Sequence, residues 1–320
     1  MKKIKYRYLV LIVLSLLIAS IALILPHVNK DKKSSETTAK KTVVSSSSSV
    51  SESSSQSSST VQVQSPSSEV VKEEFSIDNG GKSIYGYYTA PKNYKEINLP
   101  TIVFAHGFNG SAEFGDAYAQ HFAKEGYIVY SFDFSGGSPR SRSDGSIYEM
   151  SVFTEEAELT TIVQTLQKQS FVDKNNIYLL GNSQGGVVSI MTAAHLGNEI
   201  AGVFLTNPAF VLFDDAKSLF SSVDEIPERY NHKGNMVGKV YFEKSLDYNI
   251  EDTYKKVTSP VLIIQGDSDE IVPLSYAKDA EKLLVKGQLH VISGAGHMLN
   301  SQENNEAMQT IDTFLANLKK

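Results

Sequence analysis

The sequence predicts an α/β domain with a mostly parallel sheet and helices on both of its faces. Three observations support this fold class. Short apolar runs such as "TIVFAHG" alternate with segments of helical spacing, and several of these runs stop at a glycine. The alternation is typical of strands that are buried on both sides by crossover helices. In addition, Gly107, Ser183, Asp269 and His297 each follow an expected strand, and functional groups in such sheets lie beyond the carboxyl ends of the strands.

The expected elements follow one another at regular intervals along residues 74–320. Residues 75–91 are typical of two short strands around the turn Asn79-Gly80-Gly81. Later strands are expected within 101–107, 127–137, 176–183, 201–208, 260–273 and 288–297. Helical spacing marks 112–125, 155–169, 185–196, 275–285 and 304–318. Together these elements predict one domain that is long enough to bury a large core.

Residues 208–259 interrupt this alternation. The segment is polar and irregular, and it lies between two expected strands where one crossover helix would suffice. Structureless loops of this length are uncommon in compact domains, so the segment is interpreted as an inserted cap over the functional site. The alternative is a surface excursion without a role.

The N-terminal part of the chain has a different composition. Four basic residues within 1–8 precede the apolar run "LVLIVLSLLIASIALIL", and about 20 such residues are needed to cross a bilayer. We therefore expect a cytoplasmic tail (1–8), a signal anchor (9–28) and an extracellular catalytic domain on the cell membrane. Secretion after cleavage of a signal peptide is the alternative. Serine-rich residues 29–73 are expected to form a disordered tether.

Charge and cysteine content exclude several classes of function. Of 30 Lys and Arg and 36 Asp and Glu, 10 and 5 lie before residue 74, which leaves a net charge of about −11 for the rest of the chain. This acidic balance argues against a nucleic-acid partner. The chain has no cysteine, so disulfides and thiolate metal sites are excluded.

The stretch "GNSQGG" contains the candidate nucleophile. Gly181-x-Ser183-x-Gly185 has the pattern of a turn that joins a strand to a helix and exposes a serine on a sharp corner. Such a short pattern also fits a phosphate-binding or packing turn. Nucleophilic serine chemistry requires a base and an orienting carboxylate in addition.

The later part of the chain supplies both groups in the expected order. "GDSDEIVP" places Asp269 at the tip of a loop, with Asp267 as the alternative acid, and "GAGHM" places His297 in a turn after the last strand. Each aspartate could also be a helix cap or a solvated turn residue. The order Ser183, Asp269, His297 is nevertheless the one expected for this type of corner, so these three residues are the predicted catalytic triad.

An oxyanion site needs two backbone N–H groups. One is expected from Gln184, the residue after the nucleophile. The other is expected from Phe108, in the loop "FAHGFNGS" after an early strand. In this interpretation His106 shapes the loop and is not a second base. The aromatic residues of the cap are expected to line the substrate pocket, or else to pack the cap onto the domain: Phe210, Phe213, Phe220, Tyr230, Tyr241 and Tyr248.

The motifs "AHGFNGS", "FDFSGGS", "GNSQGGVVS", "GDSDEIVP" and "GAGHM" together resemble the α/β-hydrolase superfamily over nearly all of 75–320. Within it the chain is most similar to bacterial cinnamoyl and feruloyl serine esterases, which share a Ser-Gln-Gly-Gly corner and a cap after the sixth strand. The resemblance implies hydrolysis of small-molecule carboxylic esters through an acyl-enzyme, without metal or cofactor. It maps the nucleophile, acid and base to Ser183, Asp269 and His297.

Other functions fit the same sequence. An acylglycerol lipase or a serine aminopeptidase could use the same fold, because a fold does not fix the substrate. An aminopeptidase would need an acidic anchor for the free amine, and the cap is rich in acidic residues. A surface-displayed binding module that has lost its chemistry is the alternative from a different class.

Overall fold

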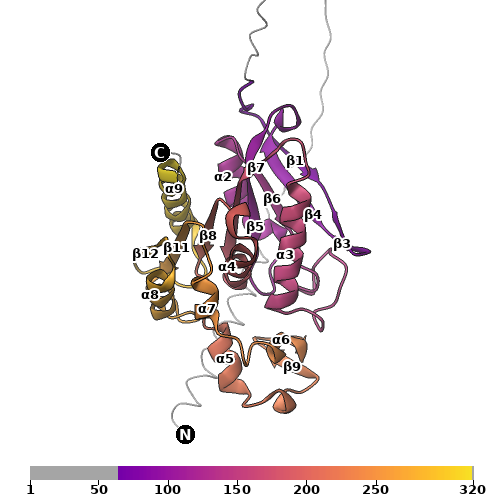
Figure 1. Ribbon diagram of the computed structural model, residues 1–320, viewed down its shortest axis with the longest axis vertical. Coiled ribbons are helices and arrows are strands. Elements are labelled where there is room, and N and C mark those ends of the chain that lie inside the picture. The colour runs from indigo at the N-terminus through magenta and orange to yellow at the C-terminus, as the bar shows by residue number, and fades with distance from the viewer. Residues whose placement is uncertain (1–63, 319–320) are drawn as a thin grey trace, which may run out of the picture. The chain divides into compact units, whose positions relative to one another are not determined.

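The computed structural model describes residues 64–318 (Figure 1). The predicted tail (1–8), the predicted anchor (9–28) and most of the predicted tether (29–73) lie outside the described residues. Among the helices of 64–318, none is both long enough and apolar enough to span a membrane.

A sheet of eight strands forms the centre of the described domain. Its spatial order is β1-β4-β6-β5-β7-β8-β11-β12. The six strands from β6 to β12 are parallel to one another, whereas β4 is antiparallel to both β1 and β6. The strands are β1 (Val70–Glu74), β4 (Gly86–Pro91), β5 (Leu99–Ala105), β6 (Ile128–Phe132), β7 (Val172–Asn182), β8 (Gly202–Thr206), β11 (Val261–Gly266) and β12 (Gly287–Ile292). β2 (Ile77–Asn79) and β3 (Lys82–Ile84) form a separate hairpin. The predicted fold class is confirmed.

The apolar runs form strands because side chains on both faces of the sheet are buried. In β7, Ile177 and Leu179 pack into one core, whereas Tyr178 and Leu180 pack into the other. Strands β5, β6, β8 and β11 alternate in the same way. A strand that is apolar on both sides needs helices above and below it, which explains why the runs lack polar alternation.

Helices cover each face of the sheet (Figure 1). Those that contribute to the larger core are α3 (Val152–Leu166), α4 (Gln184–Leu196) and α8 (Leu274–Leu283). Those that contribute to the other core are α2 (Asp116–Lys124) and α9 (Ser301–Leu318). α3 starts earlier than the apolar spacing predicts, because Ser151 and Thr154 form a reciprocal capping box at its N-terminus.

The predicted insertion is confirmed between β8 and β11, after the sixth strand of the main sheet along the chain. It contains α5 (Leu212–Leu219), the hairpin of β9 (Arg229–His232) and β10 (Asn235–Gly238), α6 (Val240–Glu243) and α7 (Ile250–Tyr254). In Figure 1, α5, α6 and β9 lie together beyond one end of the sheet. We call residues 208–259 the cap.

The sheet begins upstream of residue 74, the predicted start of the domain. β1 pairs along its whole length with β4, from Val70 opposite Pro91 to Glu74 opposite Tyr87. Upstream of β1, the Ser67 amide donates a hydrogen bond to the side chain of Asn93. Residues 70–73 are therefore strand and not tether. Their sequence, "VVKE", has two valines next to two charged residues, a short mixed pattern that suits an edge strand but does not distinguish it from a polar tether.

Candidate active site

Ser183 stands on a strained corner between β7 and α4. Its backbone has φ 51° and ψ −118°, a conformation that L-residues seldom adopt. The Ser183 amide donates to Thr206 O at 3.0 Å, and the Ser183 carbonyl accepts from the amide of Ala209 at 2.9 Å. A Cβ on Gly185 would lie 2.1 Å from Ala105 O, so only glycine allows α4 to start this close to β5. The corner predicted from the glycines is therefore present.

The structure brings together the three residues of the predicted triad. Ser183 Oγ lies 2.9 Å from His297 Nε2, and His297 Nδ1 lies 2.8 Å from Asp269 Oδ2. A carboxylate can only accept, so Nδ1 carries the proton and Nε2 is left to accept from the serine hydroxyl. This arrangement can move a proton from Ser183 to His297. Asp267 points elsewhere, because it accepts from the amide of Gly294 at 2.7 Å.

The Asp269 carboxylate is buried but well stabilised as an anion. Burial alone would raise its pKa, but the hydrogen bond to His297 and those from the amides of Ile271 and Val272, at 2.9 and 2.8 Å, together lower the pKa below its usual value. Gln265 Nε2 donates a further bond to Oδ2 at 3.0 Å. Asp269 therefore stays ionised next to His297, where a negative charge favours an imidazolium.

Asn207 fixes the loops that carry the acid and the base. Its side chain is buried at the end of β8, and its Nδ2 donates to the carbonyls of Gly296 and His297 at 3.2 and 2.7 Å. Its Oδ1 accepts from the amide of Gly266 at 2.9 Å. Asn207 was not among the site residues predicted from the sequence. Its signal is a polar side chain directly after a strand, with a positive φ of 45° that asparagine tolerates better than most residues.

The two expected oxyanion donors lie next to Ser183. Gln184 is the first residue of α4, so its N–H has no acceptor within the helix. Phe108 follows Gly107, and a Cβ on Gly107 would lie 2.9 Å from Ser183 Cβ. His106 is buried and joins this loop to the end of β6: its Nδ1 donates to Gly107 O at 2.8 Å, and its Nε2 accepts from the Phe134 amide at 3.0 Å. Burial lowers the pKa of His106, so it is neutral and both ring nitrogens are occupied.

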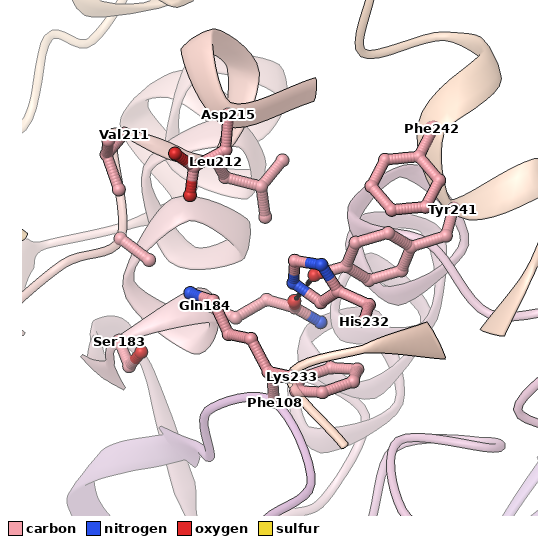
Figure 2. Close-up of a pocket in the computed structure, with 11 residues that line it drawn as sticks. Phe108, Ser183, Gln184, Val211, Leu212, Asp215, His232, Lys233, Tyr241 and Phe242 are labelled. Atoms are coloured by element: carbon pink, nitrogen blue, oxygen red, sulfur yellow. Dashed lines mark hydrogen bonds between the residues drawn. The ribbon is translucent and has the colours of Figure 1, made fainter. Parts of the chain in front are cut away.

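A pocket opens beside Ser183, under the cap. It offers about 380 Å³ of space, its open mouth included. The core domain contributes Phe108, Ser183 and Gln184, and the cap contributes Ala209, Val211, Leu212, Asp215, His232, Lys233, Tyr241 and Phe242. Figure 2 shows the Gln184 side chain directed toward His232 and Tyr241, on the side of the pocket away from Ser183. Burial lowers the pKa of His232 to about 4, so this wall is aromatic and neutral.

Five of the six cap aromatics expected at the substrate pocket do not line it: Phe210, Phe213, Phe220, Tyr230 and Tyr248. Phe210 packs on Tyr254 with ring centroids 5.0 Å apart, and Phe213 stacks on Tyr248 at 4.9 Å. Tyr230 packs against Phe220 and Phe242. These side chains hold the cap together. Of the cap aromatics named from the sequence, Tyr241 does reach the pocket.

His232 and Lys233 were not predicted to line the pocket. His232 is the last residue of β9, and Lys233 is the first residue of the two-residue hairpin turn Lys233-Gly234, in which both residues have positive φ. "HKGN" between short polar strands was a local signal for this turn. No local signal shows that the hairpin lies over Ser183, because that depends on how the cap packs.

Comparison with known proteins agrees with this geometry. The model of the prolyl oligopeptidase family matches residues 109–320. The chain is 21% identical to an uncharacterized peptidase, YtmA, of Bacillus subtilis (strain 168) over 61% of this chain and 74% of that protein. It is 20% identical to Lipase 1 of Psychrobacter immobilis over 74% of this chain and 82% of that protein.

A solved structure, Est1E from Butyrivibrio proteoclasticus with bound ferulic acid, superimposes with a TM-score of 0.70. The two chains are 26% identical, and the match covers 77% of this chain and 100% of the other. The predicted resemblance to α/β-hydrolases is thus confirmed, and a structure with bound ferulic acid is among the similar proteins.

Proposed function

This chain belongs to the prolyl oligopeptidase family, and we propose that it is a serine hydrolase that cleaves carboxylic esters through an acyl-enzyme. The observation that carries the proposal is the continuous relay from Ser183 Oγ through His297 to the buried Asp269 carboxylate. A hydroxyl in this relay is activated as a nucleophile, whereas a serine in a packing turn needs no such partners.

Each step of the reaction has a residue in position. His297 Nε2 takes the Ser183 proton as Oγ attacks the ester carbonyl. The amides of Phe108 and Gln184 stabilise the oxyanion that forms. The tetrahedral intermediate collapses as His297 returns the proton to the leaving alcohol oxygen, which leaves the acyl group on Ser183. Water, activated by the same imidazole, then hydrolyses the acyl-enzyme.

We place the acyl group in the pocket beneath the cap. Its wall contains the rings of Phe108, His232 and Tyr241, and His232 lies 5.4 and 5.0 Å from the other two, centroid to centroid. A planar aryl acid can stack against such a wall. The similarity to Est1E, which was solved with ferulic acid, supports a cinnamoyl or feruloyl ester, and a short aliphatic acyl group would also fit.

Initial rates on methyl ferulate and on a short aliphatic methyl ester test this proposal, with Ser183→Ala as the blank. A fragment for this test should begin at residue 64, so that β1 is kept. Turnover of either ester by the unsubstituted fragment, together with loss of this turnover in Ser183→Ala, supports a serine hydrolase. Comparable or faster turnover of ferulate supports the aryl-acid class. Absence of turnover, with no acylation of Ser183 by an activated ester, would leave a binding module as the better description.

Peptide hydrolysis is a second candidate, favoured by the family match and by one acidic side chain in the pocket, Asp215. A carboxylate in this position could hold the free amine of a substrate. Matched ester and amide substrates with the same acyl group separate the two functions. A peptidase cleaves the aminoacyl amide and loses this activity in Asp215→Asn, whereas an esterase does not cleave the amide.

We also propose that residues 9–28 anchor the enzyme in the cell membrane with the catalytic domain outside. The proposal is based on the basic residues and the apolar run of the N-terminal sequence. In cells that express the full chain, the catalytic domain should be found in the membrane fraction. Protease added to the intact cells should release it from that fraction. Recovery of all the protein in the medium would indicate a cleaved signal instead.

A further inference from the structure

A second cavity adjoins the triad on the side of His297. It is lined by Phe104, Phe114, Tyr118, Asn182, His297, Met298, Leu299 and Asn304, and it offers about 410 Å³, its open mouth included. It shares no lining residue with the pocket beneath the cap. The two sets of residues meet along the chain at Asn182, which lines the second cavity, and Ser183, which lines the pocket. The two cavities are therefore distinct, with Ser183 lining one and His297 lining the other.

The walls of this second cavity are fixed by contacts beneath them. Phe104 and Tyr118 stack with ring centroids 6.3 Å apart. The Tyr118 hydroxyl donates to Asn304 Oδ1 at 2.8 Å, and Asn304 Nδ2 donates to Leu299 O at 2.9 Å. Tyr118 and Asn304 thus use these polar atoms within the fold, and the wall combines apolar side chains with the polar groups of Asn182 and His297.

Two large apolar side chains at the cavity are exposed to solvent. Phe114, in the 3₁₀ helix Ala112–Gly115, is 48% exposed, and Met298 is 68% exposed. Single exposed apolar residues are common on protein surfaces. Here two of them border one cavity, and Met298 directly follows the base His297. A ligand in the cavity would remove both side chains from water.

The chemistry of acylation determines which part of an ester can occupy this cavity. The carbonyl oxygen must point toward Phe108 and Gln184, which line the pocket beneath the cap. The C–O bond that breaks must place its oxygen next to His297 Nε2, because that nitrogen returns the Ser183 proton to the leaving alkoxide. His297 lines the second cavity and not the first. The alcohol part of the substrate therefore leaves on the side of Phe114 and Met298.

We infer that the cavity formed by Phe104, Phe114, Tyr118, Met298 and Leu299 is a subsite for the alcohol part of the ester, and that the exposed side chains of Phe114 and Met298 make it prefer an apolar alcohol. The inference rests on the proposed ester hydrolysis. Binding energy at this subsite is present during acylation only, since the alcohol has left before water attacks the acyl-enzyme. The subsite therefore influences acylation and has no means to influence deacylation.

Esters of one acid with different alcohols test this inference on the full chain. We expect kcat/KM for benzyl butyrate to exceed that for methyl butyrate, and we expect Phe114→Ala to lower this benzyl-to-methyl ratio about fivefold, as for loss of part of an apolar contact. Met298→Ala should lower the ratio in the same direction. Single-turnover release of the alcohol should show that the loss lies in acylation.

Val285→Ala is the matched control, because Val285 is an apolar residue that is 71% exposed. It lies just before the first residue of β12, whereas the triad lies beyond the carboxyl ends of the strands. It should leave the ratio unchanged. A wild-type ratio near one, or an equal loss of both rates in Phe114→Ala, would overturn the subsite. Mass spectrometry of the acylated protein distinguishes the two proposals. If Ser183 is acylated but the benzyl-to-methyl ratio is unchanged in Phe114→Ala, only the subsite is wrong. If no ester acylates Ser183, the esterase proposal is wrong as well.

Discussion

The hydroxyl of Tyr241 in the cap donates a 2.7 Å hydrogen bond to Oε1 of Gln184, the residue after the candidate nucleophile. On its other side, Gln184 Nε2 donates to Oε2 of Glu155 in α3 at 2.8 Å. All three side chains are buried. The residue whose amide is expected to stabilise the oxyanion is thus held from the cap and from the core at the same time.

Tyr241→Phe should reduce kcat by several-fold, because it leaves a buried Gln184 oxygen without a donor and releases the cap from the corner. Loss of such a bond costs about 1–3 kcal/mol. Urea denaturation and steady-state kinetics on one ester would measure both effects. Tyr248→Phe is the control, since the Tyr248 hydroxyl pairs with Thr253 inside the cap. If both variants lower kcat equally, the effect comes from the cap as a whole and not from Gln184.

Asp269→Asn should lower kcat by about 10³–10⁴-fold, because an amide can donate to Nδ1 and then stabilises the wrong imidazole tautomer. Asp267→Asn provides the contrast. Asp267 is exposed and accepts from the Gly294 amide, so its loss should change kcat less than twofold, as for a surface substitution without catalytic contact. Circular dichroism would show that both variants fold. A large loss of activity in Asp267→Asn would move the acid role away from Asp269.

The triad could be predicted from the sequence because each member lies in the turn or loop that follows a strand. In a parallel sheet all carboxyl ends meet at one edge, so Ser183, Asp269 and His297 are brought together by strand order alone. The glycines at 181 and 185 mark the corner independently. Local signals and topology therefore agree at this site.

The lining of the pocket beneath the cap could not be predicted in the same way. Within the cap, every aromatic residue has similar local sequence signals, and whether it faces Ser183 depends on packing between segments far apart in the chain. Phe213 and Tyr248 stack on each other, while Tyr241 and the hairpin residues His232 and Lys233 reach the pocket. The start of the sheet was missed for a related reason, because the backbone pairing of β1 with β4 leaves little trace in composition.

Asn207→Gly should lower kcat while keeping the fold. Glycine tolerates the positive φ of this position, so the substitution removes only the three side-chain hydrogen bonds to Gly266, Gly296 and His297. The loops of the acid and the base would then be less well aligned, and we expect a loss of about 10-fold or more in kcat. An unchanged kcat would show that these loops are held by other contacts.

The buried Glu158 should make the domain less stable at neutral and higher pH than at acidic pH. Burial raises its pKa to about 7, compared with the ordinary value of 4.5, although the Ser135 amide donates to it at 2.9 Å. At pH values between 4.5 and about 7, Glu158 holds its proton in the folded state but has lost it in the unfolded state. The free energy of unfolding therefore falls as pH rises through this range, and it levels off above about pH 7.

Glu158→Gln cannot ionise, and its amide oxygen can still accept the bond from Ser135. The wild type should therefore lose up to about 3 kcal/mol more than this variant between pH 5 and pH 8, as 1.36 kcal/mol per pKa unit implies. Urea denaturation at the two pH values measures the difference. Glu125→Gln, which removes an exposed carboxylate, is the control and should follow the wild type. If Glu158→Gln shows the same pH dependence as the wild type, Glu158 is ionised in the folded domain and its burial is compensated by its neighbours.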